Sequence, residues 1–266
     1  MDFLKRNSPS IYDIPLDRII FIDIETVPEY KDYNNVPEYW QKLWDEKAKK
    51  INQNESSDKL YHRAGIYAEF GKIICICAGR FVEKNSEKIL NIKGYFSNNE
   101  SELLKKFFED IQKFENHFKN DGFKLCAHNG KEFDFPFICR RAIINKIKLP
   151  KIFKVAGFKP YEVPFIDTME LWKFGDHKSY TSLELLSYAF GIESPKNKIS
   201  GANIYELYYN HKNENNDQNK HDNKNNITEI IEYCKKDVET VAKIFLFFRQ
   251  DYHSSFKINF SYVNID

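Results

Sequence analysis

The chain has 266 residues, enough to bury a sizeable core, and its 40 basic and 39 acidic side chains leave a formal net charge of only +1. This balance excludes the strongly basic composition by which a whole protein attracts nucleic acid, so any basic surface must be local. Residues 1–10 lack the apolar run of a signal peptide, and no stretch approaches the length of a membrane span. We therefore expect a single cytoplasmic domain over residues 1–266 with no membrane contact.

The five cysteines are odd in number and mostly lie in apolar runs, which indicates reduced core residues and not a disulfide framework. Cys75 and Cys77 form the one close pair, and a spacing of two is typical of a strand. No second Cys or His pair at metal-ligand spacing accompanies them. The sequence therefore predicts no zinc site.

The first element in the chain is a buried strand around residues 19–26 that carries two acids, Asp23 and Glu25. Side chains of a strand alternate between its faces, so both acids emerge on the same face. Two carboxylates held together at a half-buried point resist ionisation unless a cation neutralises them or one stays protonated. The alternative is that both acids lie on the solvent face of an edge strand, and the pattern alone does not decide between the two.

Residues 27–70 have a mixed polar and aromatic composition, which predicts a helical insertion. Trp40, Leu43, Trp44 and Lys47 recur at helical spacing. This spacing favours packing of the tryptophans on the body of the protein over a role in stacking on nucleic acid.

Two strands are predicted at residues 72–81 and 88–96, because both segments are rich in β-branched and aromatic residues. Together with the first strand they can form a meander. Ser97 and Glu100 then match the S-x-x-E capping box of an amphipathic helix that continues to Phe118.

A second stretch of chemical interest runs from His128 to Pro136. Pro136 suits the first turn of a helix, so Asp134 lies at or near the start of that helix, where a carboxylate is favoured. The alternative is that Asp134 is only a cap and that Asn129 only forms a turn.

Near the end of the chain, residues 211–226 are rich in asparagine and lysine, which predicts a disordered surface loop. An amphipathic helix follows from Ile227. Tyr233 and Asp237 are four residues apart and so lie on one face of that helix. Taken alone, they are a partly exposed pair beside an apolar stripe.

In this order, D-x-E on a first strand, N-x4-D at a helix start and Y-x3-D on a last helix resemble the DEDD superfamily of 3′–5′ exonucleases. The resemblance implies an α/β fold of the ribonuclease H-like type, a mixed central sheet flanked by helices. It also implies that two divalent cations, Mg²⁺ or Mn²⁺, are held by Asp23, Glu25, Asp134 and Asp237. Tyr233 stands where the tyrosine subgroup, DEDDy, has its tyrosine, and Glu232 occupies the position of the alternative histidine.

Within the DEDDy subgroup, the chain looks most similar to the proofreading domain of family-B DNA polymerases and to a bacterial group of predicted stand-alone exonucleases. The likeness covers about residues 18–250, and the phrases that carry it are His128-Asn129-Gly130, Asp134-Phe135-Pro136, Phe165-Ile166-Asp167-Thr168, Ser200-Gly201 and Tyr233-Cys234. No polymerase palm, fingers or thumb follows. The resemblance thus implies no proofreading in cis, and it leaves any replication or repair partner open.

The implied reaction is removal of nucleoside monophosphates from the 3′ end of single-stranded DNA. Hard oxygen ligands suit Mg²⁺ or Mn²⁺, and two such ions ~3.5–4 Å apart can activate a water and stabilise the leaving oxygen. Tyr233 is expected to orient that water, and Thr26 and Asn129 to contact the terminal nucleotide.

Two other functions stay open. Ribonuclease D-type enzymes share the tyrosine motif, so RNA 3′-end trimming is an alternative, although the phrases around the acids favour DNA. A nucleic-acid-binding module that has lost catalysis is the other, which the complete set of motif residues disfavours.

Overall fold

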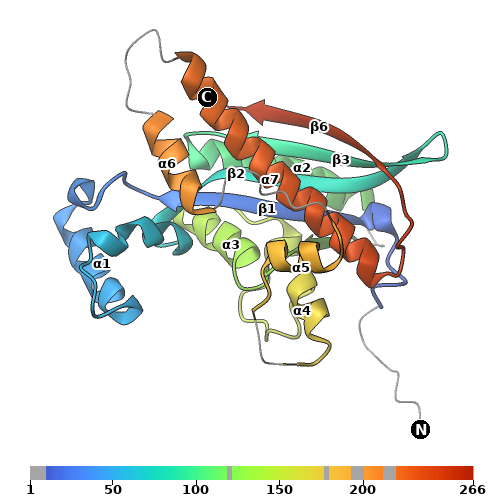
Figure 1. Ribbon diagram of the computed structural model, residues 1–266, viewed down its shortest axis with the longest axis horizontal. Helices are drawn as coiled ribbons and strands as arrows, with labels where there is room; N and C mark the ends of the chain where they lie inside the picture. Colours follow the sequence, from blue (N-terminus) through green and yellow to red (C-terminus); the bar gives the residue numbers. More distant parts are fainter. Residues whose placement is uncertain (1–9, 119–121, 177–179, 193–200, 212–219, 266) are drawn as a thin grey trace.

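The computed structural model describes residues 10–118, 122–176, 180–192, 201–211 and 220–265. Within these ranges, six strands form one mixed sheet in the order β5-β4-β1-β2-β3-β6 (Figure 1). The strands are β1 (Ile19–Pro28), β2 (Gly71–Lys84), β3 (Glu87–Phe96), β4 (Lys124–Ala127), β5 (Ile166–Asp167) and β6 (Lys257–Asn264). β1, β2 and β3 pair antiparallel, whereas β4, β5 and β6 each join the sheet parallel to a neighbour. The predicted meander is therefore confirmed.

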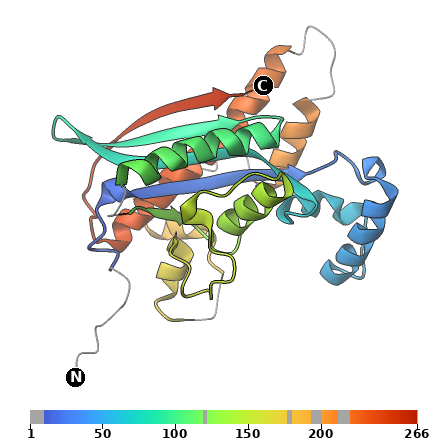
Figure 2. The ribbon, with the colours of Figure 1, turned by 180° about the vertical axis from the view of Figure 1, so that it is seen from behind.

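Helices cover both faces of this sheet, so β1 is buried on both sides. Ile19 and Phe21 pack under α6 (Gly201–His211) and α7 (Lys220–Phe248), while Ile20 and Ile22 pack under α2 (Glu100–Phe118) and α3 (Asp134–Ile144). Figure 1 shows the α7 layer and Figure 2 the α2 layer. Each fully buried side chain of this kind contributes about 1.5–3 kcal/mol. The alternation confirms the α/β prediction and directs Asp23 and Glu25 toward α7.

Helix α7 lies very close to the sheet because glycines occupy two positions beneath it. A Cβ atom added to Gly79 of β2 would lie 2.8 Å from Val238 Cγ1, and one added to Gly94 of β3 would lie 3.1 Å from Ile231 Cγ2. Any larger residue would push the helix outward, since packed interiors leave no room for an extra methyl group. This approach brings the middle of α7 against β1 and β2.

The remaining helices flank these layers. They are η1 (Leu16–Arg18), η2 (Tyr33–Asn35), α1 (Glu38–Ile51), η3 (Lys59–Ile66), η4 (Lys151–Phe153), α4 (Thr168–Lys173) and α5 (Leu183–Ala189). Leu186 of α5 packs against Ile244 and Phe248 at the end of α7. None of the helices in the described ranges is long and apolar enough to cross a membrane.

The segment from residue 27 to residue 70 contains η2, α1 and η3. Trp44 is fully buried there, with its ring 5.6 Å from that of Tyr61 and 5.3 Å from that of Phe70. Trp40 lies 5.6 Å from Phe70 but stays 41% exposed. The ring partners of both tryptophans lie within residues 27–70, so these side chains pack inside the insertion and not on the body of the protein as predicted, and the burial is complete only for Trp44.

Two other local predictions were wrong. Helix α7 begins at Lys220, so residues 220–226 are helical and not part of a disordered loop, while residues 212–219 lie outside the described residues. The N-terminus of helix α2 is not capped by a capping box of Ser97 and Glu100. Instead, Asn99 Oδ1 accepts the backbone N–H groups of Ser101 (3.1 Å) and Glu102 (3.4 Å). The acid that the box requires, Glu100, turns inward.

Glu100 is engaged in a buried ion pair with Arg141 of α3. Arg141 Nη2 donates to Glu100 Oε2 at 2.6 Å, and Arg141 Nε donates to both carboxylate oxygens at 2.9 Å. Glu100 also accepts the N–H of Ile73 on β2 (2.7 Å), and Arg141 donates to Ala68 O (3.0 Å). This single pair therefore ties α2, α3 and β2 together.

We expect Arg141→Ala to destabilise the protein by about 3–5 kcal/mol, because it leaves the buried Glu100 carboxylate without its counter-ion. Urea unfolding at neutral pH measures the change. Lys42→Ala is the control, since Lys42 pairs with Glu38 on the surface of α1 at 2.8 Å and should matter by less than about 0.5 kcal/mol. Equal effects of the two substitutions would contradict the importance of the buried pair.

Candidate active site

Two of the predicted site acids meet beside α7. A carboxyl oxygen of Asp23, one of Glu25 and the Sγ atom of Cys234 all lie within 4.8 Å of one another. Asp23 is half-buried, and Glu25 is buried. The prediction that alternation along β1 brings the two acids to one point is confirmed by this geometry.

Asp134 reaches the same part of β1 from the first turn of α3. Its Oδ1 atom accepts the backbone N–H of Ile24 at 3.2 Å. That N–H is free to donate sideways because β4 pairs with β1 only at residues 19–21. The open edge of β1 therefore lets a residue 110 positions away join Asp23 and Glu25.

Burial and mutual repulsion act on these carboxyl groups together. Burial raises the pKa of Asp23 well above its usual range, and the charges of Asp237, Glu25 and Asp134 raise it further. Burial also raises the pKa of Asp134 to about 7, with added repulsion from Asp167 and Asp237. The four predicted acids therefore repel one another electrostatically. Without a cation, the group retains protons near neutral pH.

Tyr233 lies one turn before Asp237 on α7 and is only 8% exposed. Burial raises the pKa of its phenol far above the usual value, and the charge of Asp237 raises it further. The phenol therefore stays protonated at neutral pH. It can donate a hydrogen bond but cannot act as a base.

The two residues predicted to contact substrate differ in what surrounds them. Asn129 has a left-handed backbone (φ 59°), and its Oδ1 atom is buried without a hydrogen-bond partner among the described residues. Thr26 is half-buried next to Glu25, where the register between β1 and β2 shifts. Asn129 therefore offers a hydrogen-bond acceptor that is not used within the described residues. For Thr26, the supporting observation is its position next to Glu25 on β1.

Asp167 has a role that sequence reasoning missed. It is 2% exposed, and it accepts the backbone N–H groups of Asn129 (2.9 Å), Lys131 (3.0 Å) and Met169 (2.9 Å). It therefore caps α4 and holds the turn that leads from β4 to Asp134. An acid at a strand end just before a helix was the available signal, since such a residue is a favoured N-cap.

His128 braces the same turn from the other side. Its Nδ1 lies 2.9 Å from Thr168 Oγ1 and its Nε2 lies 2.8 Å from the carbonyl oxygen of Thr181. Burial lowers the pKa of this imidazole, so it is neutral at pH 7. The histidine links the end of β4 to α4 and to the segment before α5, and it has a structural role.

Comparison with known proteins identifies the family. The sequence profile described as "RNase_H superfamily" matches residues 63–247, more than half of the chain. The chain belongs to the RNase H superfamily. The matched span contains Asp134, Tyr233 and Asp237, whereas Asp23 and Glu25 precede it. The ribonuclease H-like fold predicted from the sequence is therefore confirmed.

Among solved structures, the family B DNA polymerase from the hyperthermophilic archaeon Pyrobaculum calidifontis aligns with 91% of the chain, at 11% identity and a TM-score of 0.45. The chain spans 28% of the length of that polymerase. No curated protein matches the sequence. Membership of the RNase H superfamily supports a nuclease-type function on nucleic acid, and nucleases of this fold generally use divalent metals.

We expect the free energy of unfolding of the metal-free protein to depend on pH through the raised pKa of Asp134. Its pKa is about 7 in the folded state and about 3.9 in an unfolded chain, so the native state binds the extra proton and stability falls as pH rises from about 4 to about 7. Asp134→Asn removes this loss. In EDTA, the variant should match wild type near pH 4 and gain on it progressively up to pH 8, as measured by urea unfolding.

Asp110→Asn is a control of opposite sign. Burial raises the pKa of Asp110, but hydrogen bonds from Lys113, Lys93 and Tyr95 outweigh it and lower the value to about 2. This group stabilises the fold above about pH 4, so its removal should cost stability there. If both variants change stability with the same sign as pH rises, Asp134 is not destabilised by burial.

Proposed function

We propose that the protein is a metal-dependent 3′–5′ exonuclease that releases nucleoside monophosphates from single-stranded DNA. The observation that supports this proposal is the convergence of the acids from β1, α3 and α7 within an RNase H-superfamily fold. Burying several carboxyl groups together is unfavourable in a structural role, and such groups mark functional sites.

The donor chemistry fits divalent cations. We assign Asp23, Glu25, Asp134 and Asp237 as the ligands of two Mg²⁺ or Mn²⁺ ions, because hard carboxylate oxygens suit both metals. Bound there, the ions would supply Lewis acidity that lowers the pKa of water and stabilises the leaving 3′ oxygen. Asp23 and Asp134 would release their protons as the ions bind, since the cation charge replaces the repulsion that raises their pKa values.

The other residues position the substrate and the water. Tyr233 holds its proton and can donate a hydrogen bond that orients the attacking water. The buried Oδ1 atom of Asn129 needs a donor, and the 3′-hydroxyl of a terminal nucleotide is one. Thr26 would line the same end of the substrate. Asp167 acts through Asn129, because its carboxylate fixes the backbone of that residue.

The preference for DNA is drawn from the likeness of the sequence around the acids to polymerase proofreading domains. RNA 3′-end trimming is the second candidate. A protein tells RNA from DNA by contacts to the 2′-hydroxyl, so a direct comparison of substrates is the deciding experiment. DNA and RNA oligonucleotides of identical sequence, labelled at either end, would be digested with Mg²⁺, with Mn²⁺ and with EDTA.

On DNA, a 5′ label should stay on a shortening ladder and a 3′ label should appear at once as a mononucleotide. EDTA should stop both. Internal cuts, or activity that resists EDTA, would count against a metal-dependent exonuclease, and faster digestion of the RNA would favour the second candidate.

We expect Asp23→Asn and Asp237→Asn each to lower the Mg²⁺-dependent rate by at least about 100-fold, because each removes one ligand charge. Steady-state assays at saturating Mg²⁺ measure this. Glu232→Gln is the matched control, since Glu232 lies on the same helix and pairs with Lys235 at 2.8 Å. Wild-type turnover in either Asp variant would make the assignment wrong.

We expect Tyr233→Phe to be less damaging, with a loss of about tenfold, because the phenol only orients the water while the cations supply most of the stabilisation. Single-turnover rates of Tyr233→Phe and Asp237→Asn give the comparison. Tyr188→Phe, at an exposed tyrosine of α5, is the control. A larger loss in Tyr233→Phe than in Asp237→Asn would show that this tyrosine does more than orient.

A further inference from the structure

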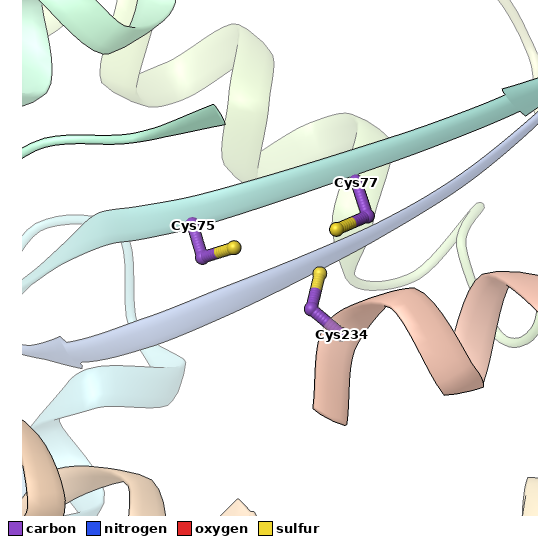
Figure 3. A group of neighbouring side chains, drawn as sticks. All are labelled: Cys75, Cys77 and Cys234. Carbon is purple, nitrogen blue, oxygen red and sulfur yellow. The ribbon is translucent and has the colours of Figure 1, made fainter. Parts of the chain in front are cut away.

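Three thiols gather between the sheet and α7, directly beside the acids. Figure 3 shows Cys75 and Cys77 of β2 together with Cys234 of α7. Their Sγ atoms lie within 4.8 Å of one another, and all three residues are 0% exposed. All three are free cysteines. We refer to Cys75, Cys77 and Cys234 as the thiol cluster.

The fold fixes where these thiols lie. Cys75 and Cys77 are alternate residues of β2, so both face α7, and Cys234 faces them from the helix. Backbone carbonyls accept two of the S–H groups: Cys234 donates to Asp23 O at 3.3 Å, and Cys77 donates to Ile231 O at 3.8 Å. The cluster is therefore held by the same contact that places α7 against β1.

We propose that the thiol cluster binds one thiophilic divalent cation, such as Zn²⁺ or Cd²⁺, with a carboxylate oxygen of Asp23 or Glu25 as the fourth ligand. Zn–S bonds of about 2.3 Å in a tetrahedral site place sulfur atoms about 3.8 Å apart. Since the Sγ atoms already lie within 4.8 Å of one another, each pair needs to close by at most about 1 Å.

The fourth ligand comes from the second group of donors. Asp23 and Glu25 each present an oxygen within 4.8 Å of Cys234 Sγ, so the two groups share this sulfur. The oxygens are grouped with Cys234 and not with Cys75 or Cys77, so one carboxylate must also move toward the cluster before three thiolates and one carboxylate can complete the four-coordinate shell of a structural zinc site. Soft thiolates select such ions over Mg²⁺, which prefers oxygen and retains water.

The acids lie nearer to solvent than the buried thiols do. Asp23 is half-buried, whereas the thiols are fully enclosed, so a cation that enters from solvent would meet the carboxylates before the cluster. Binding exchanges three S–H protons, which leave to solvent, for three metal–sulfur bonds. It also removes the hydrogen bond from Cys234 to Asp23 O.

The binding test uses the full chain, reduced and freed of metal with EDTA, then exchanged into chelator-free buffer. Co²⁺ and Cd²⁺ are the probes, and thiolate-to-metal charge-transfer absorbance reports cysteine ligation. We expect one equivalent to bind with this absorbance. Cys75→Ala and Cys77→Ala should each weaken binding by at least about tenfold. Cys126→Ala is the matched control, because Cys126 is equally buried on β4 but lies outside the cluster.

If Cys75→Ala fails to fold, Cys75→Ser and Cys77→Ala carry the same comparison, with circular dichroism as the check on folding. The proposal is overturned if wild type shows no charge-transfer absorbance, or if these variants bind as wild type does. A rise in melting temperature of wild type and Cys126→Ala with Cd²⁺, absent from Cys77→Ala, would support it independently.

One consequence rests on the proposed nuclease function. A cation that takes Asp23 or Glu25 competes with Mg²⁺, so Zn²⁺ should inhibit the Mg²⁺-dependent reaction of wild type and of Cys126→Ala at concentrations that spare Cys75→Ala. The absorbance measurement needs no nucleic acid. If no variant degrades DNA or RNA while the absorbance behaves as expected, the proposed function fails and the thiol site stands. If the wild type degrades DNA or RNA but shows no charge-transfer absorbance, the thiol site fails and the proposed function stands.

Discussion

Helix α7 can lie against the sheet only because β2 and β3 have glycines where it crosses them. With a side chain at Gly79, Val238 would have to move away. The helix carries Tyr233, Cys234 and Asp237, and the S–H group of Cys234 bonds to the carbonyl oxygen of Asp23 at 3.3 Å. This bond joins α7 to β1 directly beside the acids. A slip by one helical turn, about 5.4 Å, would carry Asp237 away from Asp23 and disperse the acids.

The same packing sets the electrostatics. Close contact removes water from the acids, so burial is the largest cause of the raised pKa values of Asp23 and Asp134. A shift of about three units, as for Asp134, corresponds to several kcal/mol. In the metal-free fold, protonation of these carboxyl groups reduces this cost. A divalent cation at the proposed site would offset this cost directly, so its affinity would come from the repulsion that the fold imposes as well as from the ligands themselves.

Patterns of short range predicted much of this arrangement. A period of two was enough to place Asp23 and Glu25 on one face of β1, because strand geometry leaves no other outcome. Turn-by-turn spacing did the same for Tyr233 and Asp237. Composition was less reliable. Residues 220–226 are polar, but they continue a helix that is stabilised by the apolar stripe beginning at Ile227, since lysine favours helices and asparagine opposes them only weakly.

Features that depend on distant partners escaped the sequence. Ser97 and Glu100 matched the local pattern of a capping box, but Arg141 draws Glu100 into a buried ion pair, and Asn99 accepts the first backbone N–H groups of the helix instead. Its position before a helix marked Asp167 as a cap of α4, but no local pattern indicated that its carboxylate would also hold Asn129 and Lys131.

The cysteines show this dependence most directly. Cys75 and Cys77 lacked further ligands at metal spacing in the sequence, yet the fold supplies Cys234 from α7 and oxygens from β1. Hard and soft donors therefore adjoin each other, with Cys234 beside both. On the assignments proposed above, Mg²⁺ on the oxygens would leave the Cys234 hydrogen bond to Asp23 intact, whereas a thiophilic ion would replace it by a metal–sulfur bond. The bound cation would then decide whether α7 is joined to β1 by a hydrogen bond or through a metal, while Gly79 and Gly94 keep the helix close to the sheet.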